Sequence, residues 1–241
     1  MTMVMAEVIE FQAHVQAIIR NHFGIVYDAE YLSEHHERQS PHYATYLWTN
    51  ENPINLTSEQ TYLKSLFDLI TPVLEVDSLR KKVRRAKATR SLRASECLVR
   101  PCKFLSFEAY HFSERLKGYC NAAKAIASTQ SGRDAIELIL ARRIKTFKSK
   151  YKDILAYRNY MVHGGNKIID PFRDISYMEL ASITGHPDLW FEFQNLFEEA
   201  QEFWIIRATE ICKEMVLSLA EIKSVNEELV QRSAFRFLAA S

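Results

Sequence analysis

Apolar residues recur at steps of three and four along most of the chain, which is the spacing of amphipathic α-helices. Near the N-terminus this pattern is carried by Val4, Val8, Phe11, Val15, Ile18 and Ile19. The first predicted helix stops near Gly24. From Ile25 to Asn55 the chain is rich in His, Tyr, Asn and Pro, so turns and loops are expected, with room for a brief helix around YDAEYLSEHHE.

Two further helices are predicted between residues 57 and 97. Thr57 and Gln60 form a capping box ahead of the apolar run YLKSLFDLI, and Pro72 marks the end of that helix. A strongly basic helix then runs from about Asp77 to Cys97.

The second half of the chain carries the longest periodic segments. One begins at Ser106, a capping residue, and ends at Gly132. The next, RDAIELILARRIKTFKSKYKDILAYRNYMVH, is either one long helix or two that meet near Lys145, and the glycine pair at 164–165 ends it. Pro187 suits a first helical turn, and the run after it, DLWFEFQNLFEEAQEFWIIRATEICKEMVLSLAEI, keeps its apolar residues in phase almost to its end.

These elements predict an all-α fold. The 241 residues are 47% hydrophobic, enough for a sizeable core, and only six Gly and six Pro disfavour a turn-rich β fold. The N-terminus lacks a basic segment followed by an apolar run, and no stretch approaches the roughly 20 apolar residues that span a bilayer. We therefore expect a single cytoplasmic domain over 1–241, with no membrane association. The cysteines lack CxxC spacing and are expected to be reduced packing residues; they are Cys97, Cys102, Cys120 and Cys212.

Positive charge is concentrated in the segment 80–93, which has eight Lys or Arg residues and no acid. Without these eight, the chain's 31 basic residues fall to 23 against 30 acidic ones. Such a stripe on a helix suits the phosphate backbone of a nucleic acid. The predicted RNA-binding residues, on one helical face and beside it, are Arg80, Lys81, Arg84, Arg85 and Lys87. The alternative is a solvated helix whose charges pair with acidic neighbours such as EFQNLFEEAQE at 192–202.

A single arginine interrupts the apolar face of the helix that precedes the glycine pair. Advancing about 100° per residue from Phe147 puts Arg158 only about 20° away, in the centre of the apolar stripe. The other members of this stripe are Tyr151, Ile154, Met161 and Val162. An arginine there must extend to solvent, pair with a buried acid, or face a surface that supplies an anion.

Asn159 and His163 lie at i and i+4 and are neighbours on the same helix, whereas His163 lies about 140° from Arg158. In a symmetric dimer, a second copy of the helix could bring its histidine to this arginine. The sequence therefore predicts a homodimer whose interface includes the face of Tyr151, Ile154, Arg158 and Met161.

Arg158, Asn159 and His163 together suit the cleavage of RNA without a metal ion. Histidine, with an ordinary pKa of about 6.5, can accept or donate a proton near neutrality. Arginine offers two donors to phosphate oxygens and stays charged as negative charge builds in the transition state. A ribose 2′-hydroxyl that attacks its own adjacent phosphate needs only such help, which would restrict the substrate to RNA.

The segment RNYMVH resembles the signature of the HEPN superfamily (higher eukaryotes and prokaryotes nucleotide-binding), in which an arginine, a polar residue and a histidine follow this spacing. The resemblance implies an α-helical bundle, a homodimer that joins two motifs in one cleft, and metal-independent endoribonuclease activity, often in prokaryotic toxin–antitoxin or antiphage systems. Arg158 and His163 would be catalytic and Asn159 the supporting polar residue. Residues 76–230 would form the HEPN-like core and 1–75 a helical extension.

The expected partners are RNA, a second copy of the chain, and an antitoxin or other regulatory protein. HEPN toxins paired with a nucleotidyltransferase antitoxin commonly carry a tyrosine two residues after the histidine, whereas this chain has Gly165.

A purely structural interpretation stands beside this one. Arg158 can pair with a buried glutamate, and His163 can end a helix where its charge suits the helix dipole. The chain would then be a non-catalytic helical module that binds RNA or a protein partner through its basic helix. The remaining histidines of note, His35, His36 and His42, have the wrong spacing for one helical face, so we expect a polar loop there and neither a metal site nor a cofactor.

Overall fold

The computed structural model of the chain describes residues 3–23, 58–90, 93–127, 129–163 and 172–231. These residues contain helices and no strands, so the all-α prediction is confirmed for this part of the chain. The helices are α1 (Met3–Phe23), α4 (Ser58–Asp68), α5 (Ile70–Arg85), α6 (Ala94–Ile126), α7 (Gln130–Lys150), α8 (Lys152–His163), α9 (Arg173–Thr184), the short 3-10 helix η1 (Pro187–Leu189) and α10 (Trp190–Gln231). The predicted loop at 25–55, Thr57 of the capping box and the glycine pair at 164–165 lie outside the described residues.

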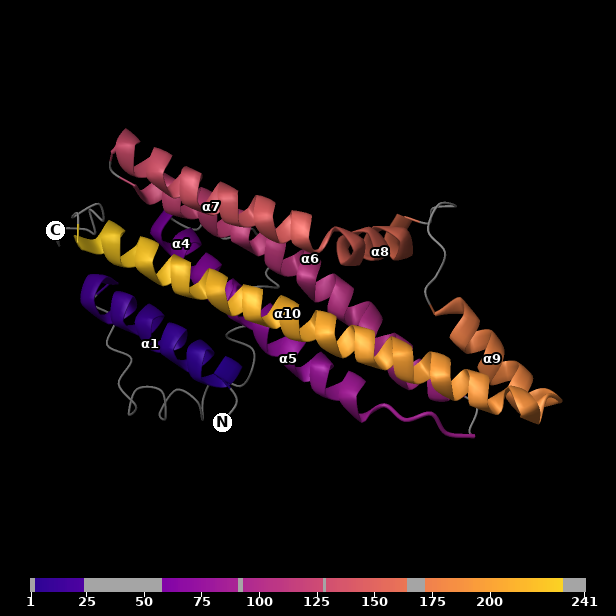
Figure 1. Cartoon of the computed structure of the whole chain (residues 1–241). Helices are drawn as coiled ribbons and strands as arrows, with labels where there is room; N and C mark the ends of the chain where they lie inside the picture. Colours follow the sequence, from indigo (N-terminus) through magenta and orange to yellow (C-terminus); the bar gives the residue numbers. More distant parts are fainter. Residues whose placement is uncertain (1–2, 24–57, 91–92, 128, 164–171, 232–241) are drawn as a thin grey trace, which may run out of the picture.

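The two longest helices, α6 and α10, organise the bundle. α6 packs against α4, α5, α7, α8 and α9, while α10 packs against α1, α5, α6, α7 and α9. Figure 1 shows α10 running along the bundle, with α1 on one side of it and α7 on the other. One hydrophobic cluster takes residues from every α-helix named above. The domain boundary predicted between residues 75 and 76 falls inside α5, and residues on both sides of it belong to this cluster.

The start of α5 differs from the prediction. Pro72 was expected to end a helix, but it lies in the first turn of α5, after the break between Asp68 and Ile70. A proline is tolerated in a first turn because the first N–H groups of a helix have no acceptor within the helix.

The predicted basic helix over 77–97 is wrong as a continuous element. α5 ends at Arg85, and residues 86–89 have no regular secondary structure. The chain then turns through Arg93, whose φ of 84° lies in the left-handed region, before α6 begins at Ala94. Ser106 does not begin a helix either, since it lies inside α6 and its hydroxyl donates to the carbonyl of Cys102 over 3.2 Å.

The N-terminus of α6 is capped by a residue from a distant part of the chain. The carboxylate of Glu179, in α9, accepts a hydrogen bond from the backbone N–H of Ser95 at 3.0 Å and a second from the Ser95 hydroxyl. Both side chains are buried. Glu179 therefore satisfies donors that the first turn of α6 cannot satisfy itself.

The long segment before His163 is two helices, which meet at Tyr151 and not near Lys145. Tyr151 (φ −113°, ψ 29°) separates α7 from α8, and its ring is fully buried with its centroid 4.9 Å from that of Phe147. α8 is described as far as His163, and the glycine pair predicted to end this segment lies outside the described residues. Pro187 begins η1 directly before α10, as the sequence indicates.

A buried polar cluster joins α4, α6 and α10. The hydroxyls of Tyr62 and Tyr119 both donate to Oδ1 of Asn226, over 2.5 and 2.6 Å. The amide nitrogen of Asn226 lies 3.4 Å from Nε2 of His14, which is half-buried on α1. One asparagine thus connects side chains from three other helices.

Ion pairs fasten α7 to α10. The guanidinium of Arg143 contacts the carboxylates of Glu214 and Glu221, and Nζ of Lys150 lies 2.8 Å from Glu214. Because Glu214 is buried, these two cations compensate a charge that would otherwise be costly.

The cysteines behave largely as predicted. All four are free thiols, of which Cys102, Cys120 and Cys212 are buried and Cys97 is exposed. Burial raises the pKa of Cys212 to about 11. Within the described ranges, no helix combines the length and the apolar character needed to cross a bilayer.

Candidate functional site

Arg158, Asn159 and His163 all lie on α8, the short helix beside α6 in Figure 1. Nη1 of Arg158 donates a hydrogen bond to Oδ1 of Asn159 over 3.0 Å. Asn159 and His163 are exposed, and His163 is the last residue of the helix. The arginine and the asparagine of the motif are thus in direct contact, while the histidine is open to solvent.

Two aromatic rings of α6 hold the arginine side chain. The guanidinium carbon of Arg158 lies 3.9 Å from the centroid of Tyr110 and 5.9 Å from that of Phe107. Such cation–π contacts keep a guanidinium at a fixed place without neutralising its charge. The sequence places Phe107 and Tyr110 on the apolar face of their helix but does not predict their contact with Arg158.

Arg158 differs from Arg80, Arg143 and Arg207, which are also partly buried, in having no carboxylate partner; Arg115 shares this property but donates to the backbone carbonyl of Asp68. Arg80, Arg143 and Arg207 each pair with an Asp or Glu side chain. Among the described residues, Arg158 forms no ion pair, and its Nε has no hydrogen-bond acceptor. The predicted alternative of a buried glutamate beside Arg158 therefore finds no support in this part of the chain, and the guanidinium keeps donors for another anion.

No hydrogen bond joins Arg158 to His163 within the described residues. Arg158 is turned toward α6, whereas His163 is exposed at the end of α8. This agrees with their predicted divergence around the helix. One chain by itself therefore does not present the two side chains as a bonded pair.

The sequence predicts a dimer interface on the face of Tyr151, Ile154, Arg158 and Met161. For two of these four residues the prediction is wrong. Tyr151 and Ile154 are buried inside the chain's own core, and Met161 packs partly against that core. These side chains continue the buried stripe that Phe147 begins, and this stripe faces the chain's own core. On α8, Ile154 and Tyr157 are both buried, and Tyr157 packs against Phe172 and Trp204.

The predicted RNA-binding residues fall into two groups. Arg80 and Lys81 both pair with the buried carboxylate of Asp77, over 2.6 Å in each case. These pairs keep the pKa of Asp77 lowered, although burial acts in the opposite direction. Their charges therefore serve the fold of α5.

Arg84, Arg85 and Lys87 are exposed and form no ion pair among the described residues. Lys87 lies beyond the end of α5, so it does not share a helical face with Arg84 as predicted. α5 and α8 both pack against α6 but do not pack against each other. The structure thus does not bring the basic segment next to the α8 motif.

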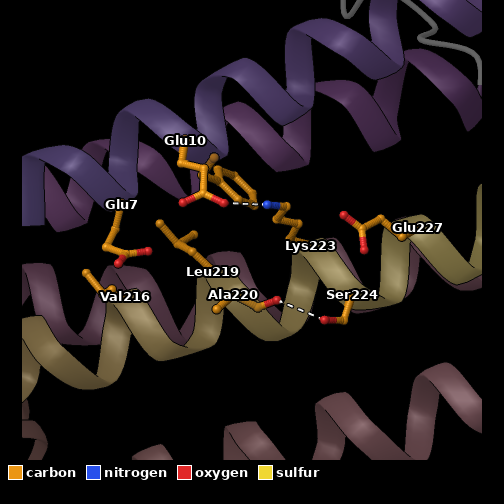
Figure 2. Close-up of a pocket in the computed structure, with 9 residues that line it drawn as sticks. Glu7, Glu10, Val216, Leu219, Ala220, Lys223, Ser224 and Glu227 are labelled. Atoms are coloured by element: carbon orange, nitrogen blue, oxygen red, sulfur yellow. Dashed lines mark hydrogen bonds and ion pairs between the residues drawn. The ribbon is translucent and has the colours of Figure 1, made fainter.

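A cavity of about 290 Å³ lies between α1 and α10, away from the α8 motif. Figure 2 shows Lys223 directed toward Glu10, with Glu7 and Glu227 also at the rim. Lys223 holds the pKa of Glu10 below its ordinary value. Three carboxylates around one ammonium make this cavity unsuitable for a phosphate.

No group of three or more His, Cys, Asp or Glu side chains in the described ranges is arranged to hold a metal ion. His35, His36 and His42 lie outside these ranges. Comparison of the chain with protein-family models, with curated proteins and with solved structures gives no match.

Proposed function

We propose that the chain is a metal-independent endoribonuclease of the HEPN type, which acts as a homodimer and serves as a toxin or antiphage effector in a prokaryotic cytoplasm. The observation that carries the proposal is the unneutralised charge of Arg158. It lies on the same short helix as Asn159, its hydrogen-bond acceptor, and the exposed His163. An arginine that is half-buried without an acid is suited to bind an anion from outside the chain.

In the proposed reaction a ribose 2′-hydroxyl attacks its own 3′-phosphate. His163 accepts the proton of the 2′-hydroxyl as the bond from the 2′-oxygen to phosphorus forms. The bond from phosphorus to the 5′-oxygen breaks, and the leaving oxygen takes a proton from a protonated second histidine or from water. Arg158 donates to the non-bridging oxygens, where negative charge increases in the transition state. The products are a 2′,3′-cyclic phosphate and a 5′-hydroxyl.

In this proposal, the homodimer brings an arginine and a histidine together, which a single chain does not do. Because Arg158 and His163 face different directions on α8, the second copy's histidine would complete each site. Val162 and His163, at the end of α8, are exposed and available for such a contact. Mixing the Arg158→Ala and His163→Ala proteins should then restore part of the activity, since one mixed site in each heterodimer regains both groups.

The test is RNA cleavage by the purified protein with EDTA present. Wild type should cleave single-stranded RNA but not DNA, and mass spectrometry should detect the cyclic phosphate or its hydrolysis product. Arg158→Ala should lower the rate by roughly two to three orders of magnitude, and His163→Ala by on the order of a hundredfold or more. Asn159→Ala should cost less, because Asn159 does not transfer the proton.

Matched controls separate catalysis from general surface effects. Arg142 and His186 are exposed and lie outside α8, so Arg142→Ala and His186→Ala should cleave like wild type. If wild type cleaves none of a broad panel of cellular RNAs, or if both motif variants remain fully active, the nuclease proposal is wrong.

The second candidate is a non-catalytic helical module that binds RNA or a protein partner. It is favoured by the contact of Arg158 with Tyr110, which by itself gives the arginine a structural role in joining α8 to α6. This candidate predicts RNA or protein binding through Arg84, Arg85 and Lys87 with no cleavage product at any enzyme concentration.

A further inference from the structure

A row of exposed and half-buried aromatic and basic side chains continues along α6 from the rings that hold Arg158. Phe104 is 48% exposed, and the guanidinium carbon of Arg100 lies 6.0 Å from the centroid of its ring. Lys103 and Phe107 are half-buried beside it. Arg100 and Tyr110 are separated by ten positions of one helix, or roughly 15 Å at about 1.5 Å per residue.

These side chains border a hollow on the surface of α6. Its volume is about 360 Å³, and its lining residues are Glu96, Val99, Arg100, Lys103, Phe104 and Phe107. Neither Arg100 nor Lys103 forms an ion pair among the described residues, so two cations face a single carboxylate there. The hollow is therefore positively charged and has an aromatic wall.

Another exposed phenylalanine has different surroundings. Phe203 on α10 is 50% exposed, but its neighbours on the helix include Glu199 and Glu202. The basic residue one turn further, Arg207, is already paired with Asp153 and Glu210. Exposure of a ring alone does not make a nucleotide site, whereas an aromatic face between unpaired cations fits the chemistry of single-stranded nucleic acid.

We infer that this face of α6 is a binding platform for single-stranded RNA, on which Phe104 stacks with a base while Arg100 and Lys103 contact the neighbouring phosphates. The strand would continue over Phe107 to the guanidinium of Arg158. The identity of the ligand as RNA rests on the proposed function. The platform supplies substrate affinity beside the reacting phosphate, at a place separate from the basic segment of α5.

Binding is measured by fluorescence anisotropy of a labelled single-stranded oligouridylate, in the His163→Ala background so that cleavage does not interfere. Phe104→Ala should weaken binding by about 5- to 150-fold, the effect of losing one base–aromatic stack. Phe104→Trp should keep the affinity, because the indole also offers a stacking face. Arg100→Gln should weaken binding and reduce the slope of log affinity against log salt by about 0.7, the value for one phosphate of a single strand. Phe203→Ala is the matched control and should bind like the parent.

Duplex RNA of the same length is the second control, since its bases are stacked inside the helix and Phe104→Ala should leave its binding unchanged. Unaltered oligouridylate binding by Phe104→Ala would overturn the platform while leaving the nuclease proposal intact if wild type still cleaves. Binding that depends on Phe104 in a protein that never cleaves would support the platform and refute the nuclease. No oligouridylate binding by the parent, or equal losses for Phe104→Ala and Phe203→Ala, would also overturn the platform.

Discussion

The guanidinium of Arg158 lies over the ring of Tyr110, 3.9 Å from its centroid, so that a residue of α8 is positioned by a residue of α6. The interaction leaves the positive charge uncompensated and restricts where it can act. It links the placement of the candidate catalytic arginine to an aromatic residue that lies 48 positions earlier in the sequence.

Tyr110→Ala should therefore lower the cleavage rate without removing any group that reacts. A cation–π interaction contributes about 1–2 kcal/mol when partly desolvated, which corresponds to roughly a tenfold effect on kcat if it positions the arginine. Tyr110→Phe keeps the ring face and should retain the wild-type rate. The test is to measure kcat and KM for both variants, with thermal melting as a check on folding. Equal rates for Tyr110→Ala and Tyr110→Phe would exclude a positioning role.

The exposed part of the basic segment should contribute to RNA affinity. Changing Arg84, Arg85 and Lys87 together to Gln should weaken RNA binding and flatten the dependence of log affinity on log salt, by about 0.7 for each phosphate of a single strand that the variant no longer neutralises. Arg80→Gln should act differently. It weakens the compensation of buried Asp77 and should lower the free energy of unfolding with little effect on the salt slope. An unchanged slope in the triple variant would remove this segment from the binding surface.

Removing the carboxylate that caps α6 should destabilise the protein. Glu179→Ala leaves the buried N–H and hydroxyl of Ser95 without their acceptor and should cost about 1–3 kcal/mol in the free energy of unfolding, measured by urea denaturation. Glu198→Ala, an exposed glutamate on α10, should cost less than about 0.5 kcal/mol. In Glu179→Ala, the exchange of backbone amide hydrogens should become faster first at the start of α6. Equal midpoints for the two variants would contradict the capping role.

Stability should depend on pH through His14. Burial holds the pKa of His14 below its ordinary value of 6.5, with Lys223 acting in the same direction and Glu227 in the opposite one. The folded chain therefore binds fewer protons than the unfolded chain between the lowered pKa and pH 6.5. The contribution of neutral His14 is complete above pH 6.5 and is lost as the pH falls through the lowered pKa.

The corresponding measurement is the free energy of unfolding from pH 7.5 to pH 5 for wild type and for His14→Gln, which cannot titrate. As the pH falls, the free energy of unfolding of wild type should decrease relative to that of His14→Gln. A difference that stays constant over this range would show that His14 is not the titrating group.

Periodicity predicted α1 and most of α10, whose apolar residues recur at regular helical steps. It failed where long-range contacts decide the structure. The beginning of α6 at Ala94 depends on Glu179, which lies 84 residues away from Ser95, and no local pattern indicates this cap. Ser106 has the chemistry of a helix cap, but it lies inside α6, which begins twelve residues earlier at Ala94.

For the candidate site too, the sequence predicted the local features and missed the long-range ones. The spacing of Arg158, Asn159 and His163 was visible in the sequence because all three lie on one helix. The break at Tyr151 was not, and neither was the burial of Tyr157, which lies in the core like Ile154 while Arg158 is only half-buried. Nor could one helix reveal that the aromatic support comes from Phe107 and Tyr110 of another.

The shared oxygen of Asn226 has a consequence for how the long helices of this bundle are aligned. Apolar faces that repeat every few residues tolerate a slip of one helical turn, about 5.4 Å, because one leucine or valine can replace another. Hydroxyls of Tyr62 and Tyr119 cannot be displaced in this way. Sliding α10 by one turn would bury two hydroxyls and an amide without partners, at about 1–3 kcal/mol for each. The asparagine thus selects one alignment of α10 against α4 and α6 from several that hydrophobic packing alone would allow.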